Sequence, residues 1–430
     1  MERCAIGLIG WGTVGGGVVE ILTRDAALLR ERCGLDLVIT RIVTRTPQRA
    51  RQAPPPTGAV VGDDLAGLLA DPEIRTVIHL VGGTTEATDI CRRCLAAGKH
   101  VVTANKAMLA EQGDELFTLA AAHGVSLAFE AAVAGGIPLI AALRDGLVAN
   151  RIEGIYGILN GTCNFILSSM ESGGADFASA LHEAQRLGYA EADPTLDVDG
   201  TDTAHKLAIL ARIAGNGRIP LAAVRVEGIQ GITIEDIASA KAMGARIKLL
   251  AVALLRPQGL ELRVAPTLVP LDHPLAAVYG SQNGIVITSN NAQSTFLMGP
   301  GAGALPTASA IVADLVDVCA GRYLETFNRF RFLSAETPVL VLDEAEEYTA
   351  SYARFAVADR AGVLAGIAST LSAHNVSLRS LRQMDTEGKD HAIIEVITHP
   401  SRGGSFLAAI NAIDASGLTV RTTKALRKLE

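Results

Sequence analysis

The chain has 430 residues, of which 49% are hydrophobic and 19% charged, a composition that fits a folded globular protein and argues against disorder. This length exceeds a single ordinary core, so we expect two or three domains. The formal net charge of −7 gives no electrostatic reason for a nucleic-acid partner, and none is expected.

Residues 1 to about 135 alternate short apolar runs with helical patterns, which indicates an α/β domain with βαβ units around a parallel, Rossmann-like sheet. Strands are predicted at 4–9, 37–43, 76–80, 100–103 and 125–130. Helices are predicted at 14–29, 65–70, 85–97 and 113–122. A further helix beginning near Pro306 is expected to return to this domain, so that about 301–330 completes it.

A glycine pattern, Gly10-Trp-Gly12-Thr-Val-Gly15, follows the first predicted strand and opens a helix, which is the context of a dinucleotide site. The first glycine permits a tight turn, the second lets the backbone approach a pyrophosphate, and the third allows close helix–strand packing. The alternative is a glycine-rich turn without a ligand. We expect cofactor contacts from Gly10, Gly12, Thr13, Val14 and Gly15.

The end of the second strand predicts which cofactor binds. An NAD site usually places an acid there for the ribose hydroxyls, whereas this strand ends in Arg45, followed by Arg49 and Arg51, without an acid. Because a guanidinium beside the ribose suits a 2′-phosphate, NADP is favoured and NAD remains possible. The alternative, solvated surface arginines, suits Arg49 and Arg51 better than Arg45.

Two further loops stand where parallel strands end, which is where ligands bind in such folds. One contains Gly83 and Thr84, and the other contains Thr103 and Lys106. All four are expected to line the cofactor site. Lys106 is placed for the active crevice, although a surface lysine at a helix start fits the pattern equally well.

The middle region, 136–300, mixes helices with strands that look antiparallel, and an α+β substrate-binding and dimerisation domain is expected there. Its densest polar stretch holds five carboxylates within twelve residues. These are Glu191, Asp193, Asp197, Asp199 and Asp202. A calcium loop is disfavoured because the glycine is misplaced and no Glu ends the stretch. Helix-capping acids would explain one or two of the five.

A lysine follows the acids, and Asp202 and Lys206 share a helix face because they are four residues apart. The acids suit an ammonium group on a substrate. A lysine can exchange the hydroxyl proton during hydride transfer. If Lys106 reaches the same crevice, mutual repulsion should lower the pKa values of both lysines. The residues alone thus predict an NADP enzyme acting on a small alcohol or aldehyde that bears an amino group.

The C-terminal region follows a linker expected at 331–350, where a proline and an acidic run occur. Within 351–430, strands are predicted at 352–358, 376–384, 391–398 and 418–423. Helices are predicted at 362–373 and 404–413. This βαββαβ order is that of a small ferredoxin-like module.

Three other features concern membrane spans, cellular location and cysteines. The best apolar stretch, 127–143, is interrupted by Glu130 and Pro138, so no membrane span is expected. The N-terminus runs directly into the glycine pattern without a removable signal peptide, so a cytoplasmic location is expected. Six cysteines make no disulfide framework, and Cys91 and Cys94 are expected to be reduced helix residues rather than a zinc or redox pair.

The stretch Ala184-x-x-x-Gly188-Tyr-Ala-Glu-Ala-Asp193-Pro-x-x-Asp197-Val-x-Gly200-x-Asp202-x-x-x-Lys206 resembles the signature of homoserine dehydrogenases. HVVTANKAML, FEAAVAGGIPLI, GILNGTCNFIL and GPGAGALPTASAIVADL resemble segments of that family in the same order. The resemblance implies NAD(P)-dependent interconversion of L-homoserine and L-aspartate 4-semialdehyde, within threonine, methionine and isoleucine biosynthesis. A reductase of another amino aldehyde, or a nucleotide-sensing protein without catalysis, is the alternative.

The same resemblance implies roles for residues of the active site. Lys206 would exchange the proton at the substrate oxygen, and Lys106 would lie near nicotinamide and substrate. The implied substrate-binding residues are Glu191, Asp202, Asp197, Gly161, Thr162 and Tyr189. Glu130, Val133, Gly135 and Ile137 would hold a sodium or potassium ion, mostly by backbone carbonyls. Gly303 would touch the cofactor, although the entry turn of a helix would explain this glycine too. Cys163 is expected to be a packing residue, with thiol sensitivity as the alternative.

Residues 352–430 resemble an ACT-type regulatory domain. Asp359 and Gly362 stand at its first strand–helix turn, and Asn375 follows the helix. Such domains pair edge to edge and bind amino acids, which implies threonine as feedback inhibitor and a homodimer or homotetramer. A purely structural dimerisation module is the alternative.

Overall fold

A six-stranded parallel sheet organises the N-terminal part of the computed structural model, which describes residues 2–48, 54–215, 217–329, 338–384 and 391–430. Its strands are β1 (Glu2–Ile9), β2 (Leu35–Val43), β3 (Val60–Gly62), β4 (Ile74–His79), β5 (His100–Thr103) and β6 (Leu127–Ala128). The spatial order is β3-β2-β1-β4-β5-β6, and every pair is parallel. The expected Rossmann-like sheet is confirmed, and the strand order reverses beside β1, where ligands bind in such folds.

The helices around this sheet are α1 (Thr13–Arg24), α2 (Ala26–Cys33), α3 (Leu65–Ala70), α4 (Glu86–Ala96), α5 (Lys106–Ala122), α12 (Ala304–Cys319) and α13 (Arg322–Arg329). The single helix expected at 14–29 is broken at Asp25. The helix expected at 113–122 begins earlier, because the Asn105 side chain caps it by accepting from the Met108 amide. α12 returns to pack on α1, where a Cβ on Gly17 would lie 2.7 Å from the Ala304 carbonyl oxygen.

A second, mixed sheet begins in the middle of the chain with β7 (Ile152–Ile158), β8 (Arg225–Val226), β9 (Ala245–Arg256), β10 (Gly259–Pro270), β11 (Gln282–Ser289) and β12 (Gln293–Pro300). Its helices are α6 (Leu139–Ala141), α7 (Gly161–Gly173), α8 (Phe177–Arg186), α9 (Thr195–Val198), α10 (Thr201–Gly215) and α11 (Ile234–Ala242). α10 is buried at eleven of its fifteen positions, so it is a central element rather than a surface helix. It therefore holds the side chains on its first turns rigidly.

The C-terminal part consists of β13 (Tyr348–Ala358), α14 (Val363–Ala373), β14 (Leu378–Met384), β15 (His391–Thr398), β16 (Ser401–Arg402), α15 (Gly403–Ala415) and β17 (Lys424–Lys428). The order β17-β13-β15-β14 and the packing of α14 on α15 confirm the ferredoxin-like module. The last strand was expected at 418–423, and that position is wrong. Leu418 packs against the module's own core, while β17 forms later and pairs parallel with β10, through Thr267 opposite Arg427.

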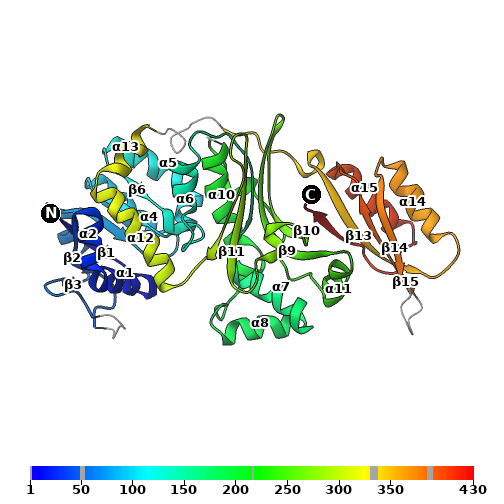
Figure 1. Ribbon diagram of the computed structural model, residues 1–430, viewed down its shortest axis with the longest axis horizontal. Helices are drawn as coiled ribbons and strands as arrows, with labels where there is room; N and C mark the ends of the chain where they lie inside the picture. Colours follow the sequence, from blue (N-terminus) through cyan, green and yellow to red (C-terminus); the bar gives the residue numbers. More distant parts are fainter. Residues whose placement is uncertain (1, 49–53, 216, 330–337, 385–390) are drawn as a thin grey trace.

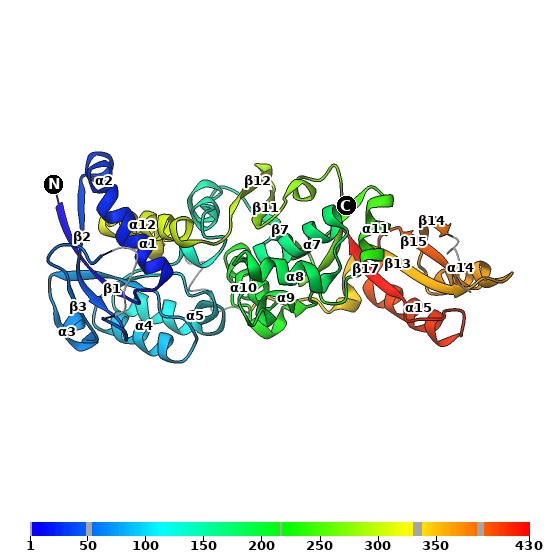
Figure 2. The same ribbon diagram turned by 90° about the horizontal axis from the view of Figure 1, so that it is seen from below.

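The β10–β17 pairing joins the two parts into one continuous sheet. In Figures 1 and 2 the three parts lie in a row along the long axis, and the C-terminus lies at the junction of the second and third. The described end of the expected linker runs along β10, where the Leu260 amide donates to Leu340 and the Leu342 amide donates to Leu260. The residues of that linker up to 337 lie outside the described residues.

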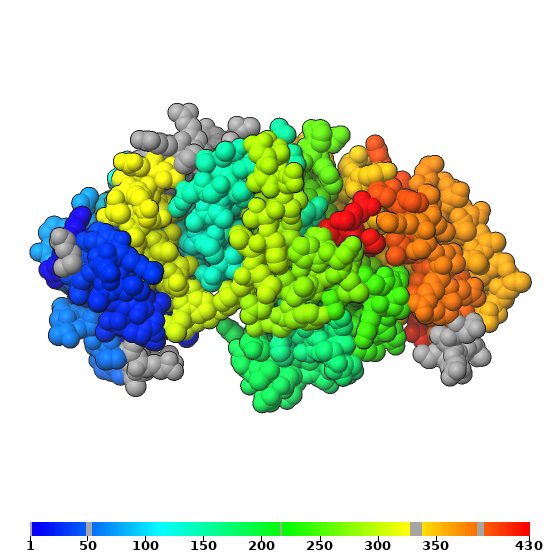
Figure 3. Space-filling model, in the orientation of Figure 1, coloured from blue at the N-terminus to red at the C-terminus, as the bar shows by residue number. Residues whose placement is uncertain are grey.

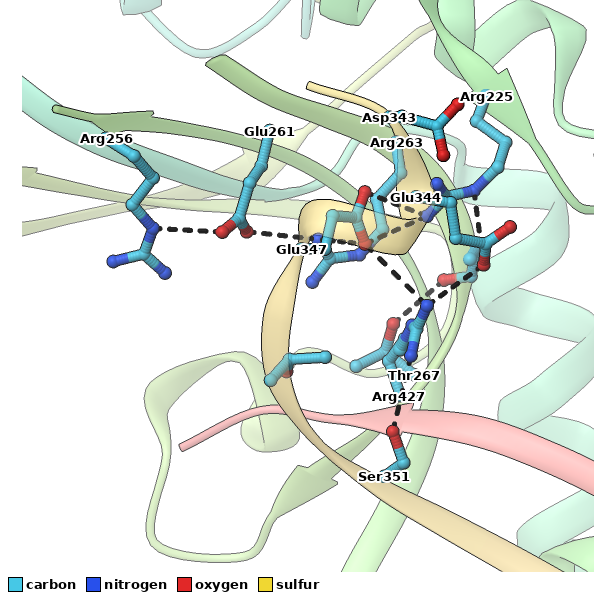
Figure 4. Close-up of polar contacts among 12 residues, drawn as sticks. Arg225, Arg256, Glu261, Arg263, Thr267, Asp343, Glu344, Glu347, Ser351 and Arg427 are labelled. Carbon is cyan, nitrogen blue, oxygen red and sulfur yellow. Dashed lines mark hydrogen bonds and ion pairs between the residues drawn. The ribbon is translucent and has the colours of Figure 1, made fainter. Parts of the chain in front are cut away.

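Buried ion pairs also cross this junction (Figure 4). Glu347, at the start of β13, lies 3.0 Å from Arg225 and 3.4 Å from Arg263, and its side chain is 1% exposed. Arg427 of β17 lies 2.9 Å from Glu344. Because breaking one partner of a buried pair leaves a charge without compensation, this network favours one fixed placement of the C-terminal part.

Cys91 and Cys94 are buried in α4. Burial raises the pKa of the Cys94 thiol to about 12 and that of Cys91 further, so both thiols stay protonated and pack as small apolar groups. Across the ranges that the structure describes, no helix combines the length and apolar character needed to cross a membrane.

Candidate active site

The glycine loop after β1 has the geometry of an anion cradle. Gly10 has φ +95°, and a Cβ there would lie 2.9 Å from the Leu80 carbonyl. A Cβ on Gly15 would lie 2.5 Å from the Gly10 oxygen, so the helix passes too close for any side chain. Gly12 caps α1 and faces open space, beside the amides of Thr13 and Val14. These residues fit the pyrophosphate of a dinucleotide.

The two further loops are tied together by Asn105. Its amide nitrogen donates to the Val81 carbonyl at 3.0 Å and to the Gly83 carbonyl at 2.7 Å. The Gly83-Thr84 turn and Lys106 therefore lie side by side at the end of the sheet. Thr103 is different, because its hydroxyl is fully buried and donates to the His79 carbonyl. Only its backbone could reach a cofactor.

Arg45 and Gly303 lie at the edges of this site. The Arg45 side chain is 84% exposed, and its guanidinium lies 3.5 Å from Glu86 in the first turn of α4. Arg49 and Arg51 lie outside the described residues. Gly303 has φ +124° and caps α12, so its backbone serves the helix entry.

The structure brings Lys106 and Lys206 onto one carboxylate. Lys106 Nζ lies 3.0 Å from Asp202 Oδ1, and Lys206 Nζ lies 2.7 Å from Asp202 Oδ2. Lys206 Nζ also donates to the Leu159 carbonyl at 2.7 Å. α5 of the parallel-sheet part and α10 of the middle part thus meet at Asp202. Figure 3 shows the surface hollowed between the N-terminal part and the helices α7 and α8.

The paired lysines correct one expectation. We expected repulsion to lower both pKa values, but Asp202 lies between the ammonium groups and raises the pKa of Lys106, against the effect of burial. Burial alone would raise the pKa of Asp202; Lys206 and Lys106 together lower it well below its usual range. Asp202 is therefore ionised and Lys106 protonated at neutral pH.

Asn160 is a site residue that the sequence reasoning missed. Its amide nitrogen donates to Asp197 at 2.7 Å and to Asp202 at 2.9 Å, while its oxygen caps α7 by accepting from the Cys163 amide. Asn before a helical run signals a cap, but nothing in the sequence indicates that the other end of this amide holds two acids. Burial raises the pKa of Asp197, and the hydrogen bond from Asn160 opposes this rise and helps to keep the carboxylate ionised.

The five acids divide into two groups. Asp193 accepts from Thr195, and Asp199 accepts from the Thr201 amide, so these two are local caps. Asp202 contacts both lysines directly, and Asp197 is linked to it through Asn160. Glu191 is exposed in the same loop. The capping explanation was thus right for two acids and does not apply to the others.

The remaining substrate candidates surround this loop. The Thr162 hydroxyl donates to the Tyr189 carbonyl at 2.7 Å, which ties α7 to the acidic loop. A Cβ on Gly161 would lie 2.6 Å from the Ser281 oxygen. The Cys163 thiol is buried and donates to the Asp197 carbonyl, and burial raises its pKa, so it packs as expected.

The candidate cation residues lie in one turn beside Gly301 and Thr307. The Glu130 carboxylate accepts from the Ile140 and Ala141 amides, and the Ile137 carbonyl accepts from Leu139. Within the described ranges, no group donates a hydrogen bond to the carbonyl oxygens of Val133 and Gly135. Unused carbonyls beside a buried carboxylate are the donor set that a hard cation prefers.

A second buried acid adjoins this turn. Asp314 of α12 accepts from the Glu130 amide at 2.8 Å, and burial followed by the nearby Glu130 raises its pKa well above the usual value. Nothing in the sequence marked Asp314, because a single acid in an apolar helix does not reveal what it faces.

The regulatory candidates do not come together within one chain. Asp359 and Gly362 precede α14, and Asn375 follows its end. Eleven helical residues separate the two ends by roughly 16 Å. Gly362 and Asn375 both have positive φ, at +92° and +58°, as turns at a helix start and end require.

Comparisons with known proteins agree along the whole chain. The family model described as homoserine dehydrogenase matches residues 138–316, its NAD-binding domain matches 10–130, and the ACT domain matches 351–416. The homoserine dehydrogenase of Pseudomonas aeruginosa is 42% identical, with 98% of each chain covered. That of Neisseria gonorrhoeae is 42% identical, with 96% of each covered.

Solved structures give the same result. The homoserine dehydrogenase of Thiobacillus denitrificans has a TM-score of 0.94 at 40% identity, with 100% of this chain and 99% of that chain covered. A hyperthermophilic archaeal homoserine dehydrogenase mutant in complex with NADPH has a TM-score of 0.63 at 27% identity, covering 74% of this chain and 98% of that chain.

Proposed function

This chain belongs to the homoserine dehydrogenase family of NAD(P)-dependent oxidoreductases, and we propose that it reduces L-aspartate 4-semialdehyde to L-homoserine with NADPH. The observation that carries the proposal is the pair of lysines on Asp202, at the meeting point of the nucleotide-binding and middle parts. When bound, the nicotinamide supplies the hydride to the aldehyde carbon.

Lys206 donates the proton in this proposal. Its ammonium has three hydrogens, of which Leu159 and Asp202 accept two, so one remains for the substrate oxygen. In the oxidative direction the neutral amine would take that proton back. Asp202 positions the group, and Lys106, whose side chain is 38% exposed, lies at the open side of the same carboxylate.

The substrate's amino end is assigned to the acidic loop. Asp202 already accepts from both lysines and Asn160, so exposed Glu191 is the acid best able to receive an ammonium group. Asp202 adds negative charge near the ammonium group, and Asp197 helps to fix the pocket by accepting a hydrogen bond from Asn160. The Gly161 and Thr162 amides, at the start of α7, suit the substrate carboxylate, with Tyr189 alongside.

The substrate assignment is tested by steady-state assay. NADPH oxidation with L-aspartate 4-semialdehyde should yield one homoserine per NADPH, measured by absorbance and amino-acid analysis. Faster turnover of an amino aldehyde one methylene longer would contradict the substrate assignment.

We also propose that threonine inhibits the enzyme through the ACT domain. Threonine should slow the wild type more than it slows Asp359→Ala, and equal wild-type rates with and without threonine would contradict regulation.

NADP preference is proposed from Arg45, which stands at the end of β2 where an NAD site would place an acid. The archaeal relative bound to NADPH supports this choice. Arg45→Ala should raise KM for NADPH about tenfold, because one charge-assisted contact to a phosphate is worth roughly 1.5–3 kcal/mol. KM for NADH should change less than twofold. Equal changes for the two cofactors would contradict the assignment, and Arg24→Ala, at the far end of α1, is the matched control.

A sodium or potassium ion is proposed at Val133, Gly135 and Ile137 with Glu130, supported by the unused carbonyls and the buried acids. Turnover in sodium or potassium buffer should exceed turnover in tetramethylammonium buffer, whereas a purely structural turn would give equal rates in all three.

A homodimer or homotetramer is also proposed. It is supported by β12, which ends the sheet order and exposes Phe296 and Met298.

A further inference from the structure

A cavity of about 470 Å³ lies between α11 and the C-terminal sheet. It is remote in the sequence from every residue assigned above to substrate, cofactor or cation. Its size is that of small-molecule sites in proteins. Asp359 and Gly362 do not line it, so a ligand here goes beyond the proposed function.

The alternation of β13 and β15 creates one wall of this cavity. Phe355, Val357 and Ile394 point into the core shared with α14 and α15. Arg354, Ala356 and Ile393 therefore point to the opposite face of the sheet, and all three line the cavity. The cavity is thus a gap between two docked parts of the fold rather than a groove on an open surface.

α11 forms the other wall and is held in place by a buried ion pair. Asp236, whose side chain is 1% exposed, lies 2.7 Å from Arg354 of β13. The same carboxylate accepts from the Thr233 amide and hydroxyl in a capping box. Because both walls are fixed without a ligand, the cavity is preformed, which reduces the ordering cost of binding.

The lining combines cationic groups with polar groups, which include Glu235 and His391, and with an apolar floor. Ala238, Ala242 and Met384 add to the apolar surface of the sheet. Arg421 lines the cavity and forms no ion pair within the described ranges. Lys424 forms a long ion pair, with 3.7 Å between its ammonium and Glu227. Arg354 is already compensated by Asp236, so Arg421 and Lys424 are the cations available to a ligand. We propose that this cavity binds a small organic carboxylate with an apolar body.

The site is connected to the catalytic loop through the residues after Glu227. The Ile229 amide donates to the Val198 carbonyl at 2.9 Å, and a Cβ on Gly228 would lie 2.3 Å from the same oxygen. Val198 follows Asp197, which Asn160 holds beside the lysines. A carboxylate that draws Lys424 away from Glu227 therefore acts on the segment that supports Asp197.

The test uses the full chain saturated with NADP⁺, which keeps the nucleotide site filled, and 8-anilinonaphthalene-1-sulfonate as a fluorescent apolar anion. One saturable probe site per chain is expected. Arg421→Glu and Lys424→Glu should each weaken the probe at least tenfold, and Ala242→Trp should fill the cavity. Arg402→Glu, an exposed arginine of the same module that does not line the cavity, is the control and should leave binding within twofold.

Competition identifies the ligand class. 4-Methylpentanoate should displace the probe, whereas 4-methylpentylamine, with the same body and opposite charge, should not. Displacement by both or by neither overturns the proposal, as does equal binding by wild type and both charge variants. Saturating 4-methylpentanoate should also shift KM for the aldehyde in wild type but not in Lys424→Glu, and an unchanged KM overturns the connection. The binding readout does not depend on catalysis, so failure of the proposed reaction would leave it intact.

Discussion

Lys206→Ala is expected to lower kcat for the reduction of aspartate semialdehyde by about 10²–10⁴-fold, the usual contribution of a positioned proton donor. The variant loses the hydrogen of the Lys206 ammonium that Leu159 and Asp202 leave for the substrate oxygen. Lys106 remains on Asp202, so that carboxylate keeps one compensating charge. KM for NADPH should change little, because no glycine-loop contact is altered.

The measurement is steady-state NADPH oxidation together with a fluorescence titration of NADPH, which reports cofactor binding separately. Lys241→Ala is the matched control, since Lys241 is exposed in α11 and forms no ion pair within the described residues. Ethylammonium added to Lys206→Ala should restore part of the rate, as a free amine can enter the space left by the side chain. A variant with near wild-type kcat would refute the proton role.

Local patterns predicted the parts of this molecule that depend on local geometry. The glycine spacing predicted the turn at Gly10 and the close contact at Gly15, because each depends on a few consecutive residues. The spacing of Asp202 and Lys206 predicted that they share a helix face, because i,i+4 residues are neighbours on any helix, and the two side chains lie 2.7 Å apart. Strand and helix order similarly predicted the ferredoxin-like module.

Contacts between distant segments were not predictable in the same way. The sequence could not place Asp202 between Lys106 and Lys206, so the sign of the pKa change for Lys106 was wrong. β17 was misplaced because its position is set by pairing with two distant strands, β13 and β10, which overrides the local pattern at 418–423. Asn160 was missed for the same reason, since its role depends on the distant carboxylates that accept hydrogen bonds from its amide.

Asp202→Asn should give the largest loss of stability among single substitutions at this site. The amide has the same shape but no charge, and two ammonium groups that now lie 3.0 and 2.7 Å from the carboxylate would be left facing each other. Removing one partner of a buried ion pair costs roughly 3–5 kcal/mol. Urea unfolding at pH 7 measures the loss, with Asp199→Asn as control. Asp199 accepts from the Thr201 amide and forms no ion pair among the described residues. Asn caps about as well, so the control should change little.

The pH dependence separates this charge effect from a packing defect. In wild type, the pKa of Asp202 is lowered, so its stabilisation is present above about pH 4 and is lost as pH falls through the folded value. The pKa of Lys106 is raised, so its stabilisation is present below about pH 10 and is lost as pH rises through the folded value. In Asp202→Asn, repulsion between the two ammonium groups disfavours their protonation in the folded state, which then binds fewer protons than the unfolded chain. Its stability should therefore rise with pH, and the difference from wild type should shrink between pH 7 and 10. A difference that stays constant over this range would contradict the proposed role of Asp202 as the charge that holds both lysines.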